Sequence, residues 1–522
     1  MPGENELKKA PPLRAGVIDI GSNSIKLIIG EAAGEEVRVL ETLKNVIPIG
    51  NSTFFKGSIS QETTNQVIGI LEKYKKILAQ YDLAKVMVIG TTAIREARNR
   101  DVFLDTVARK TGFKIEVFSV GDVIYYIDAY ISHKLQKAYP IHNKNLIIAE
   151  IGAGSLDVSV MRKGFMLMNM GLSIGALRVR QLMSKLDGSR EEITEAVQEY
   201  IENDFAYLKR VMPRIQIDDV ILIDENYSYL QSILPNKKPT SDFFKFSQED
   251  SKEVLAQLLE RSDEDVAKTY KIPREVSDTM IAYAIILDMF FKLTENKYIY
   301  ILETSLAEAV LANVLFDFEL SEKYNKQNQL IAVATFLCNK YDIDLNHVQQ
   351  VANLAKTLFD SLKDYLGLKN DDLLYLLLAA YLHDIGIFIH NRSHHKHSEY
   401  IISSLSLFRL TEDEMMMIAC VARYHRKAPP IGTHPLYNSL SSENQILIQK
   451  LSAILRIANS LDRSHKQKIS QLEVKFNRNG DVTISVQAKD NILLEKADFL
   501  EKKDLFEEIT GNSINLTVKS GV

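Results

Sequence analysis

The sequence predicts two related α/β domains, followed by an all-α domain and a small α+β tail. A strand, a tight loop of small residues and a second strand occur twice, over 16–31 and 146–161. Strands alternate with helices around both copies, which is typical of α/β domains. From about residue 320, long runs with helical spacing replace this pattern. A chain of 522 residues has room for three or four domains.

The first domain continues beyond its opening hairpin. Apolar residues recur with helical spacing over 58–81, and Ser58 with Gln61 fits a capping box at the start of that helix. A β-branched run at 86–89 and a segment at 114–119 predict two further strands. A helix is expected after each of these strands.

The two loops of small residues align without a gap. Asp-Ile-Gly-Ser-Asn-Ser at 19–24 corresponds to Glu-Ile-Gly-Ala-Gly-Ser at 150–155, so a carboxylate, an isoleucine, a glycine and a serine recur at identical spacing. Such a short match alone arises by chance, but the same strand pattern surrounds both copies. The repeat therefore predicts a duplicated domain.

The C-terminal part of the chain changes from helices to alternating strands. Helical runs extend to about residue 464, and from Ile469 alternating apolar residues predict a hairpin with its turn at Asn479 and Gly480. We expect five parts along the chain: a flexible tail at 1–13, α/β domains at 14–132 and 133–318, a helical domain at 319–466 and a small α+β domain at 467–522.

Composition excludes some classes of protein. The formal net charge is −5, which argues against a specific nucleic-acid binder because such proteins usually carry a strong basic excess. No run of about 18 apolar residues occurs, so we expect no membrane span. The two cysteines, Cys338 and Cys420, lie in apolar helical runs, which is consistent with a reducing cytoplasm rather than a disulfide framework.

The paired loops have the composition of a phosphate-binding site. A turn of small residues after a strand exposes backbone N–H groups, and serine and asparagine add side-chain donors. A carboxylate at the strand end, Asp19 or Glu150, can position Mg²⁺ directly or through water. The alternative is a pair of plain hairpin turns. The candidate phosphate-binding residues are Gly21, Ser22, Asn23, Ser24, Gly152, Gly154 and Ser155.

Arg95 follows the next predicted strand, in the segment Gly90-Thr91-Thr92-Ala93-Ile94-Arg95-Glu96. A threonine can cap the helix that begins there, which places the guanidinium beside helix N–H groups as a phosphate clamp. On these residues alone, a surface ion pair with Glu96 or Glu116 is the simpler interpretation.

Three segments occur in a fixed order: VIDIGSNSIKLIIGE at 17–31, GTTAIREARN at 90–99 and GLSIGALRVR at 171–180. Together with the later His-Asp-Ile-Gly region, they resemble the exopolyphosphatase / guanosine pentaphosphate phosphohydrolase (Ppx/GppA) family. The resemblance implies duplicated actin-like domains of the sugar-kinase type and a homodimer. It also implies Mg²⁺-dependent release of the terminal phosphate from inorganic polyphosphate or from pppGpp, through attack of water on the end phosphorus.

The second loop departs from the pattern of that family. Where the family has an Asp and, seven positions later, a catalytic Glu, this chain has Glu150 and Asp157, so the two side-chain lengths are exchanged. The family's Ser-Gly-x-Glu-Glu-Ala-Arg motif is reduced here to Asp122 without the second Glu or the Arg. A glycine-rich turn expected near 221–230 is absent, and Ala307 replaces a family Arg. Because catalysis depends on sub-ångström placement, these changes put activity in question.

The resemblance assigns roles to the candidate residues. Asp157 and Asp122 are expected to orient or activate water, and Asp19 and Glu150 to hold Mg²⁺. Arg95 and the loop residues are expected to hold the terminal phosphate and offset its charge in the transition state.

A histidine-rich region suggests a second metal site. Seven of the eleven histidines lie between 347 and 425. His347, the adjacent pair His383 and Asp384, and the later Asp462 are spaced like the HD superfamily of metal phosphohydrolases, although Asn459 stands where many of its members place the last Asp. Imidazole and carboxylate ligands suit Mn²⁺, Fe²⁺ or Zn²⁺. The alternative is a structural domain that keeps a hydrogen-bonded His-Asp pair without metal.

Three functional hypotheses follow. The chain is a phosphoanhydride hydrolase acting at the paired loops, a catalytically weak or inactive sensor that binds polyphosphate or (p)ppGpp, or a metal-dependent phosphohydrolase acting through its HD-like domain. The sequence does not distinguish polyphosphate from pppGpp.

Overall fold

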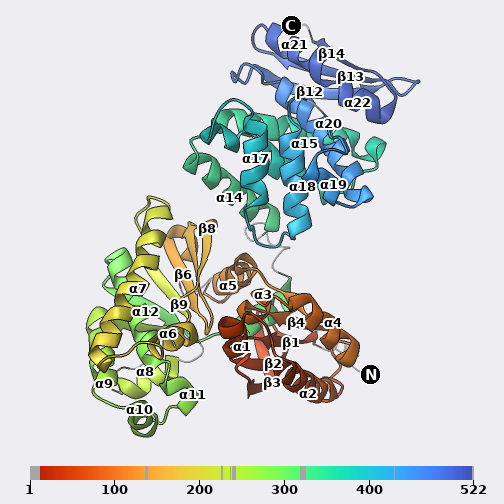
Figure 1. The fold of residues 1–522 in the computed structure, drawn as a ribbon. Helices are drawn as coiled ribbons and strands as arrows, with labels where there is room; N and C mark the ends of the chain where they lie inside the picture. Colours follow the sequence, from red (N-terminus) through yellow and green to blue (C-terminus); the bar gives the residue numbers. More distant parts are fainter. Residues whose placement is uncertain are drawn as a thin grey trace, which may run out of the picture. The chain divides into compact units, whose positions relative to one another are not determined.

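The computed structural model describes residues 12–135, 139–224, 227–235, 237, 243–317, 325–427 and 429–519. The chain divides near residue 325 into two compact units (Figure 1). Most of the expected tail at 1–13 lies outside the described residues, and so does the expected boundary at 318/319.

The first unit begins with a five-stranded sheet of order β3-β2-β1-β4-β5. Its strands are β1 (Arg14–Ile20), β2 (Ser24–Ala33), β3 (Glu36–Val46), β4 (Lys85–Gly90) and β5 (Glu116–Val117). The first three strands are antiparallel, and β4 and β5 run parallel to β1. The central strands carry apolar side chains on both faces, as a sheet covered on both sides requires.

The second sheet repeats the topology of the first. Its order is β10-β11-β9-β6-β7-β8, so an antiparallel trio, β8-β7-β6, again continues into two parallel strands, β9 and β11, and an antiparallel edge strand, β10, is added. The strands are β6 (Asn145–Ile151), β7 (Leu156–Arg162), β8 (Phe165–Leu172), β9 (Asp219–Ile223), β10 (Phe244–Ser247) and β11 (Tyr298–Leu302). The predicted duplication is confirmed, and with it the actin-like fold of two α/β domains.

Two buried helices cross between the halves of the first unit. Helix α5 (Val120–Lys134) follows the first sheet but packs on β7 and β8 of the second, whereas α13 (Leu306–Phe316) packs on β1 and β2 of the first. The two helices also pack on each other. Each is apolar on most of its surface, and the carboxyl of Asp128 inside α5 accepts a hydrogen bond from Ser159 on β7. The halves are therefore tied together by exchanged helices.

The first unit contains further helices. They are α1 (Ile49–Lys56), α2 (Gln61–Leu78), α3 (Thr92–Arg95), α4 (Arg100–Thr111), α6 (Ala176–Met183), α7 (Arg190–Val211), α8 (Tyr227–Ile233), α9 (Gln248–Leu259), α10 (Asp263–Tyr270), α11 (Arg274–Ser277) and α12 (Met280–Thr294).

The second unit is a helical bundle that carries a three-stranded sheet. The helices are α14 (Lys326–Lys340), α15 (Leu345–Leu366), α16 (Asp372–Leu382), α17 (His394–Ser403), α18 (Glu412–Arg423), α19 (Pro435–Ser439) and α20 (Ser442–Ser460). The sheet, of order β12-β13-β14, consists of β12 (Ile469–Phe476), β13 (Val482–Ala488) and β14 (Ile514–Val518), with α21 (Leu493–Lys502) and α22 (Asp504–Thr510) between its last two strands. Gly480 has a positive φ of 89° in the β12–β13 turn, as the sequence predicted.

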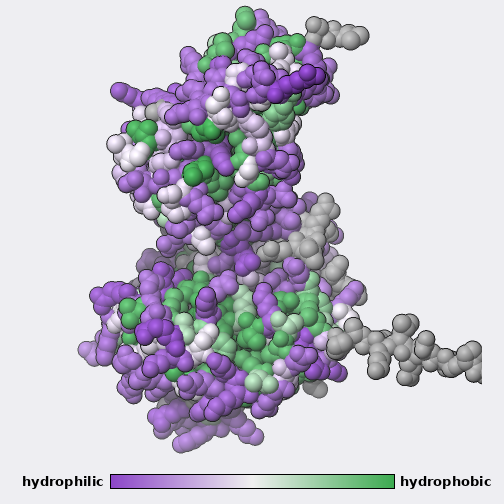
Figure 2. Space-filling model, turned by 90° about the vertical axis from the view of Figure 1, so that its right-hand side faces the viewer, coloured by the Kyte–Doolittle hydropathy of each residue, from purple (hydrophilic) through white to green (hydrophobic). Residues whose placement is uncertain are grey.

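Hydrophilic side chains cover most of the face shown in Figure 2. Within the described part of the chain, no helix combines the length and the hydrophobicity that crossing a bilayer requires. Cys338 and Cys420 are both buried and free.

The predicted capping box of α2 is wrong. The helix begins at Gln61, and the N-cap is Ser60, whose hydroxyl accepts a hydrogen bond from the backbone N–H of Thr63 at 3.1 Å. The reason lies one residue earlier, because the side-chain amide of Asn99 bonds both the N–H and the carbonyl of buried Ile59 and keeps that residue outside the helix.

Replacing Ser60 with Ala should lower the free energy of unfolding by about 1 kcal/mol, the usual loss for an N-cap hydroxyl. Ser58→Ala should leave it unchanged. Urea denaturation of the two variants measures both values, and a larger loss for Ser58→Ala would restore the capping box expected from the sequence.

Candidate active site

The two loops of small residues close in the same way. The N–H of Gly21 donates to the carbonyl of Ser24 at 2.9 Å, and the N–H of Gly152 donates to the carbonyl of Ser155 at 2.9 Å. One loop joins β1 to β2 and the other joins β6 to β7, which are equivalent positions in the two sheets. The alignment seen in the sequence is therefore a repeat of backbone geometry.

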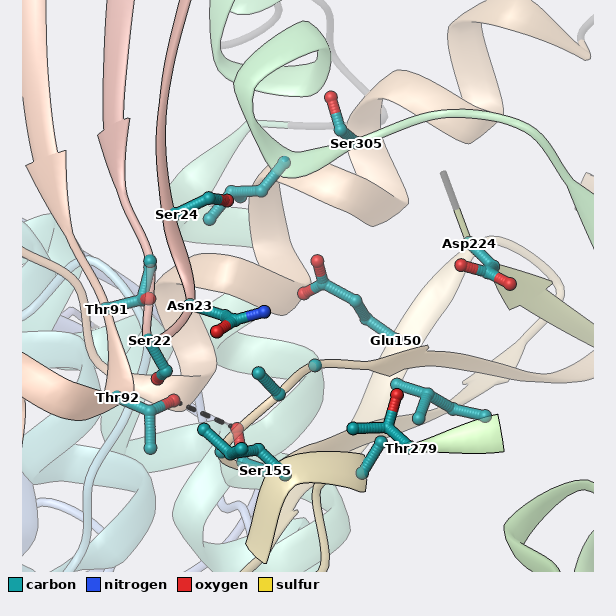
Figure 3. Close-up of a pocket in the computed structure, with 18 of the residues that line it drawn as sticks. Ser22, Asn23, Ser24, Thr91, Thr92, Glu150, Ser155, Asp224, Thr279 and Ser305 are labelled. Carbon is teal, nitrogen blue, oxygen red and sulfur yellow. Dashed lines mark hydrogen bonds between the residues drawn. The ribbon is translucent and has the colours of Figure 1, made fainter. Parts of the chain in front are cut away.

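The loops lie against each other. A Cβ on Gly154 would stand 3.0 Å from the hydroxyl of Ser22, so no other residue type fits at this contact without displacement. The hydroxyls of Thr92, from the first half, and Ser155, from the second, are 3.0 Å apart (Figure 3). Small residues in the loops thus serve the close approach of the two halves as well as the exposure of backbone amides.

A cleft of about 420 Å³ opens beside the paired loops. In Figure 3 the carboxylate of Glu150 points into it, between Asn23 and the strand end that carries Asp224. The cleft is lined by all the predicted phosphate-loop residues and by three of the predicted carboxylates: Gly21, Ser22, Asn23, Ser24, Gly152, Gly154 and Ser155, with Asp19, Glu150 and Asp157.

Arg95 lies behind this lining. Its guanidinium donates to the carbonyl of Phe118 at 2.8 Å and to the hydroxyl of Thr92 at 3.2 Å. The interpretation as an ion pair with Glu96 is not what the structure shows, because the carboxylate of Glu96 pairs with Arg178. Arg95 therefore supports the Thr92–Ser155 contact and places its positive charge near Asp157.

Asp122 is held at the start of α5. Its carboxylate accepts hydrogen bonds from the N–H of Ser119 at 2.9 Å and from the hydroxyl of Ser119 at 2.8 Å, which completes a capping box. It does not line the cleft as Asp157 does. Its expected role in orienting water stays a prediction.

Asp157 is a buried carboxyl group of the cleft lining with a shifted pKa. It is 4% exposed, and among the described residues its Oδ1 has no hydrogen-bond partner. Burial raises the pKa of Asp157 to about 6, against the opposing effect of Arg95 and of a hydrogen bond with Ser155. A buried carboxyl with a pKa near neutrality can accept a proton from water.

Glu150 and Asp157 are direct partners in the antiparallel pairing of β6 and β7. Paired residues on neighbouring strands point to the same face, with Cβ atoms about 4.5–5.5 Å apart. The exchange of side-chain lengths relative to the family pattern therefore falls on two adjacent positions. The longer side chain, Glu150, is therefore paired with the shorter one, Asp157.

Two lysines that the sequence analysis did not select line the cleft. Lys26 and Lys44 are partners in the pairing of β2 and β3, and both line the cleft. Like charges at directly opposed positions repel, and a bound polyanion would relieve that repulsion. Lys26 could have been predicted from the sequence. Side chains alternate between the two faces of a strand, so Lys26, two residues after Ser24, lies on the same face as Ser24.

The sequence analysis also did not select Arg178, although this residue lies in the segment GLSIGALRVR at 171–180. Its Nε donates to the carbonyl of Gly154 at 2.6 Å, and its Nη2 pairs with Glu96 of the first half. It thereby holds the second loop against the first half. Only the three-dimensional arrangement gives it this role.

The cleft offers ligands of the kind that Mg²⁺ prefers. Asp19 and Glu150 are the penultimate residues of β1 and β6, and both residues line the cleft. Magnesium is usually held by one or two carboxylates with substrate phosphates and water completing its shell. The residues present therefore fit Mg²⁺.

The second unit gathers the histidines that the sequence selected. His347, His383, Asp384 and Asp462 are all buried. Asp462 accepts a hydrogen bond from Nδ1 of His347 at 2.8 Å, so it orients this imidazole. Burial lowers the pKa of His383 to about 4, which leaves its ring neutral at pH 7.

The group that could hold a metal differs from the expected one. Among the described residues, potential ligand atoms come together in two sets that share Asp384, one with His347 and His465 and one with His394 and His425. His394 and His425 belong to the histidine-rich region noted in the sequence, but the sequence offers no means of choosing them as ligands.

Comparison with known proteins agrees with the fold. Two duplicated α/β sheets with matched loops between them define an actin-like protein. Residues 27–318 match the Ppx/GppA phosphatase family, and residues 330–509 match Ppx/GppA phosphatase, domain III. The chain belongs to the Ppx/GppA phosphatase family.

Sequence relatives are distant but nearly full-length. The chain is 23% identical over 458 residues to a guanosine-5'-triphosphate,3'-diphosphate pyrophosphatase of Pseudoalteromonas translucida, covering 85% of this chain and 86% of the relative. It is 21% identical over 494 residues to the protein of that name from Vibrio vulnificus, covering 92% of both.

Solved structures resemble part of the chain. An Aquifex aeolicus Ppx/GppA family member matches with a TM-score of 0.51 and 19% identity, covering 60% of this chain and all of that one. An exopolyphosphatase from Cytophaga hutchinsonii matches with a TM-score of 0.51 and 21% identity, covering 58% of this chain and 97% of that one. At these identities the likeness supports the fold.

Gly175→Ala tests the packing behind the second loop. A Cβ there would meet the backbone nitrogen of Ser155 at 2.4 Å and the carbonyl of Ala153 at 2.5 Å, so the loop must move. We expect a loss of stability of about 1–3 kcal/mol and weaker binding of tripolyphosphate. The matched control is Gly69→Ala in α2, where nothing lies within 4 Å. Equal effects of the two changes in thermal melts and binding titrations would contradict this account.

Asp157→Asn should stabilise the ligand-free protein above pH 6. The pKa of Asp157 is raised from 3.8 to about 6 on folding, so the ionised carboxylate opposes folding. That cost is absent below pH 3.8 and complete above about pH 6, where removing the charge should contribute roughly 1–3 kcal/mol. Chemical denaturation at pH 5 and pH 8 measures it, with exposed Asp187→Asn as the control. A variant less stable than the wild type at pH 8 would argue against a strained carboxylate.

Proposed function

We propose that the chain is a Mg²⁺-dependent hydrolase that releases the terminal phosphate of inorganic polyphosphate or of pppGpp. The observation that carries this is the buried carboxyl of Asp157, with its pKa raised to about 6, in a cleft formed by two phosphate-binding loops. Family membership and the names of the Pseudoalteromonas and Vibrio relatives support the phosphoanhydride as the bond cleaved.

The loops hold the phosphate that leaves. Amide and hydroxyl donors of Ser22, Asn23 and Ser24 approach it from one side, and those of Gly154 and Ser155 approach from the other. Fixed donors of this kind stabilise negative charge on the phosphoryl oxygens as the bond breaks. Lys26 and Lys44 attract the rest of the phosphate chain.

Asp157 activates the attacking water. Its ionised carboxylate accepts a proton from water, the water oxygen bonds to the terminal phosphorus, and the bond from that phosphorus to its bridging oxygen breaks. Inorganic phosphate and the shortened chain, or ppGpp, are the products. Bound Mg²⁺, held by Asp19 and Glu150, would neutralise charge on the phosphate oxygens.

The alternative is a binding protein with little or no catalysis. It is favoured by the hydrogen bonds that hold Asp122 in the cap of α5, because they occupy one of the two carboxylates expected to act on water. A further alternative places hydrolysis in the second unit, at the cluster around Asp384.

Phosphate release distinguishes these functions. It should be measured with Mg²⁺ on polyphosphate and on pppGpp, using the wild type, Asp157→Asn and the double variant His383→Ala/Asp384→Ala. We expect loss of at least 100-fold in Asp157→Asn and little change in the double variant, since removing a general base typically costs about 10²–10⁴-fold. Loss only in the double variant would move catalysis to the second unit. No release by the wild type, with measurable binding of either ligand, would establish the sensor.

The catalytic rate should fall on the acid side with an apparent pKa near 6. Asp157 acts as a base only when ionised, and burial, opposed by Arg95, sets its pKa at about 6. A pH profile of kcat/KM from pH 5 to 8, which reports the free enzyme, should lose activity tenfold per pH unit at low pH. A profile that stays flat down to pH 5 would exclude Asp157 as the base.

The exchanged carboxylates should behave as a coupled pair. Asp157→Glu and Glu150→Asp each restore one family residue. Each change alone makes the two paired side chains equal in length, whereas both the family and this chain pair a long side chain with a short one. We expect each single variant to lose about 10–100-fold in kcat and the double variant to recover much of that loss, because neighbouring residues are not additive. Additive losses in the double variant would show that the exchange is not compensatory.

A further inference from the structure

The second unit contains a buried cluster of imidazoles around one carboxylate. Asp384 follows α16, and His394 begins α17, while His425 follows α18. These three residues are at most 6% exposed. Helices α17 and α18 pack closely on each other, so the cluster sits where three helix ends meet. Such a collection of polar groups requires a partner for each polar atom.

The hydrogen bonds fix which nitrogen of each ring carries a proton. Nδ1 of His394 lies 3.0 Å from the carbonyl of Asn391, and Nδ1 of His425 lies 2.6 Å from the carbonyl of Ala422. A carbonyl only accepts, so Nδ1 is the protonated nitrogen in both rings. Each neutral ring then presents an unprotonated Nε2 to the cluster. In histidines that bind metals, the ring nitrogen that does not bind the metal typically donates such a hydrogen bond.

The same orientation recurs in the neighbouring rings. Nδ1 of His383 donates to the carbonyl of Ala380 at 2.8 Å, and Nδ1 of His347 donates to Asp462. Nε2 of His383 has no hydrogen-bond partner among the described residues. The Nε2 atoms of His383 and His347 lie 3.5 and 3.9 Å from Oδ2 of Asp384. Four imidazoles therefore direct a lone pair toward one carboxylate, an arrangement that repels unless a cation lies among them.

The spacing of three of these atoms matches the coordination of a metal ion. Nε2 of His394 and Nε2 of His425 are 3.2 Å apart. Oδ1 of Asp384 is 3.2 Å from the first and 3.7 Å from the second. A tetrahedral ion with bonds of 2.0–2.1 Å separates its ligand atoms by about 3.3–3.4 Å. The three atoms thus form one face of a tetrahedron of the right size.

We propose that His394, His425 and Asp384 bind a divalent transition-metal ion of the Zn²⁺, Fe²⁺ or Mn²⁺ class. Two imidazoles and one carboxylate suit these ions better than Mg²⁺ or Ca²⁺, which prefer oxygen. The set differs from the one expected from the sequence, because Asp462 serves His347 and the metal ligands come from α17 and the end of α18.

The competing explanation is a purely organic cluster. In it His394 carries a second proton and donates from Nε2 to Asp384, and Arg426, whose Nη1 lies 3.5 Å from that nitrogen, supplies further positive charge nearby. This cluster needs no metal and predicts no affinity for one. The two explanations therefore differ in a direct binding measurement.

Cobalt titration of the full chain tests the proposal. After chelator treatment and dialysis, Co²⁺ is added to the wild type, His425→Gln, Asp384→Asn and His395→Gln, and visible absorption is recorded. Tetrahedral Co²⁺ with nitrogen ligands absorbs strongly, whereas Co²⁺ held by oxygen in the Mg²⁺ site absorbs weakly. We expect the wild type to develop the strong band at one equivalent and Zn²⁺ to displace it.

The variants decide whether the band belongs to this cluster. His425→Gln and Asp384→Asn should lose the band, and His395→Gln should retain it, since His395 is equally buried and next in sequence to His394 but belongs to neither ligand set. Circular dichroism and thermal melts establish that each variant is folded. If one ligand variant does not fold, the other carries the comparison, as does His394→Gln. A wild type without the strong band, or a band that survives in the folded ligand variants, would overturn the proposal.

Discussion

The structure of the cleft depends on one backbone hydrogen bond that is made twice. In each half a glycine N–H bonds the carbonyl of a serine three residues later, from Gly21 to Ser24 and from Gly152 to Ser155. The residues of both closed loops line the cleft. Gly154 and Gly175 then allow the loops to touch each other and the helix behind them, where any side chain would collide. The exchanged helices α5 and α13 hold the two halves in this arrangement.

The chemistry of the cleft opposes its stability. Asp157 is buried where its charge is unfavourable, and only Arg95 and a serine hydroxyl offset that cost. A carboxylate kept in such a position is poised to take a proton, which is the property a hydrolase needs. Its partner across the strands is Glu150, so the two carboxylates whose lengths are exchanged in the second loop are neighbouring side chains. The two loops themselves close with the same backbone hydrogen bond.

Much of this arrangement was predictable from the sequence, and the exceptions have physical reasons. The loops and the duplication follow local rules of turns and strands, so their residues line the cleft as expected. The packing of α5 on the second sheet depends on contacts far apart in the chain. Asp122 was chosen by resemblance, but it caps its own helix. Asp462 fits the spacing of a metal ligand, yet the orientation of the His347 ring decides its role.

The most direct test of the central claim is a crystal structure of the Asp157→Asn protein with Mg²⁺ and tripolyphosphate, in which hydrolysis is blocked. The account predicts a terminal phosphate held between Ser22–Ser24 and Gly154–Ser155, with the amide of residue 157 facing its phosphorus and the chain running toward Lys26 and Lys44. Tripolyphosphate bound elsewhere on the protein, with the cleft empty, would contradict it.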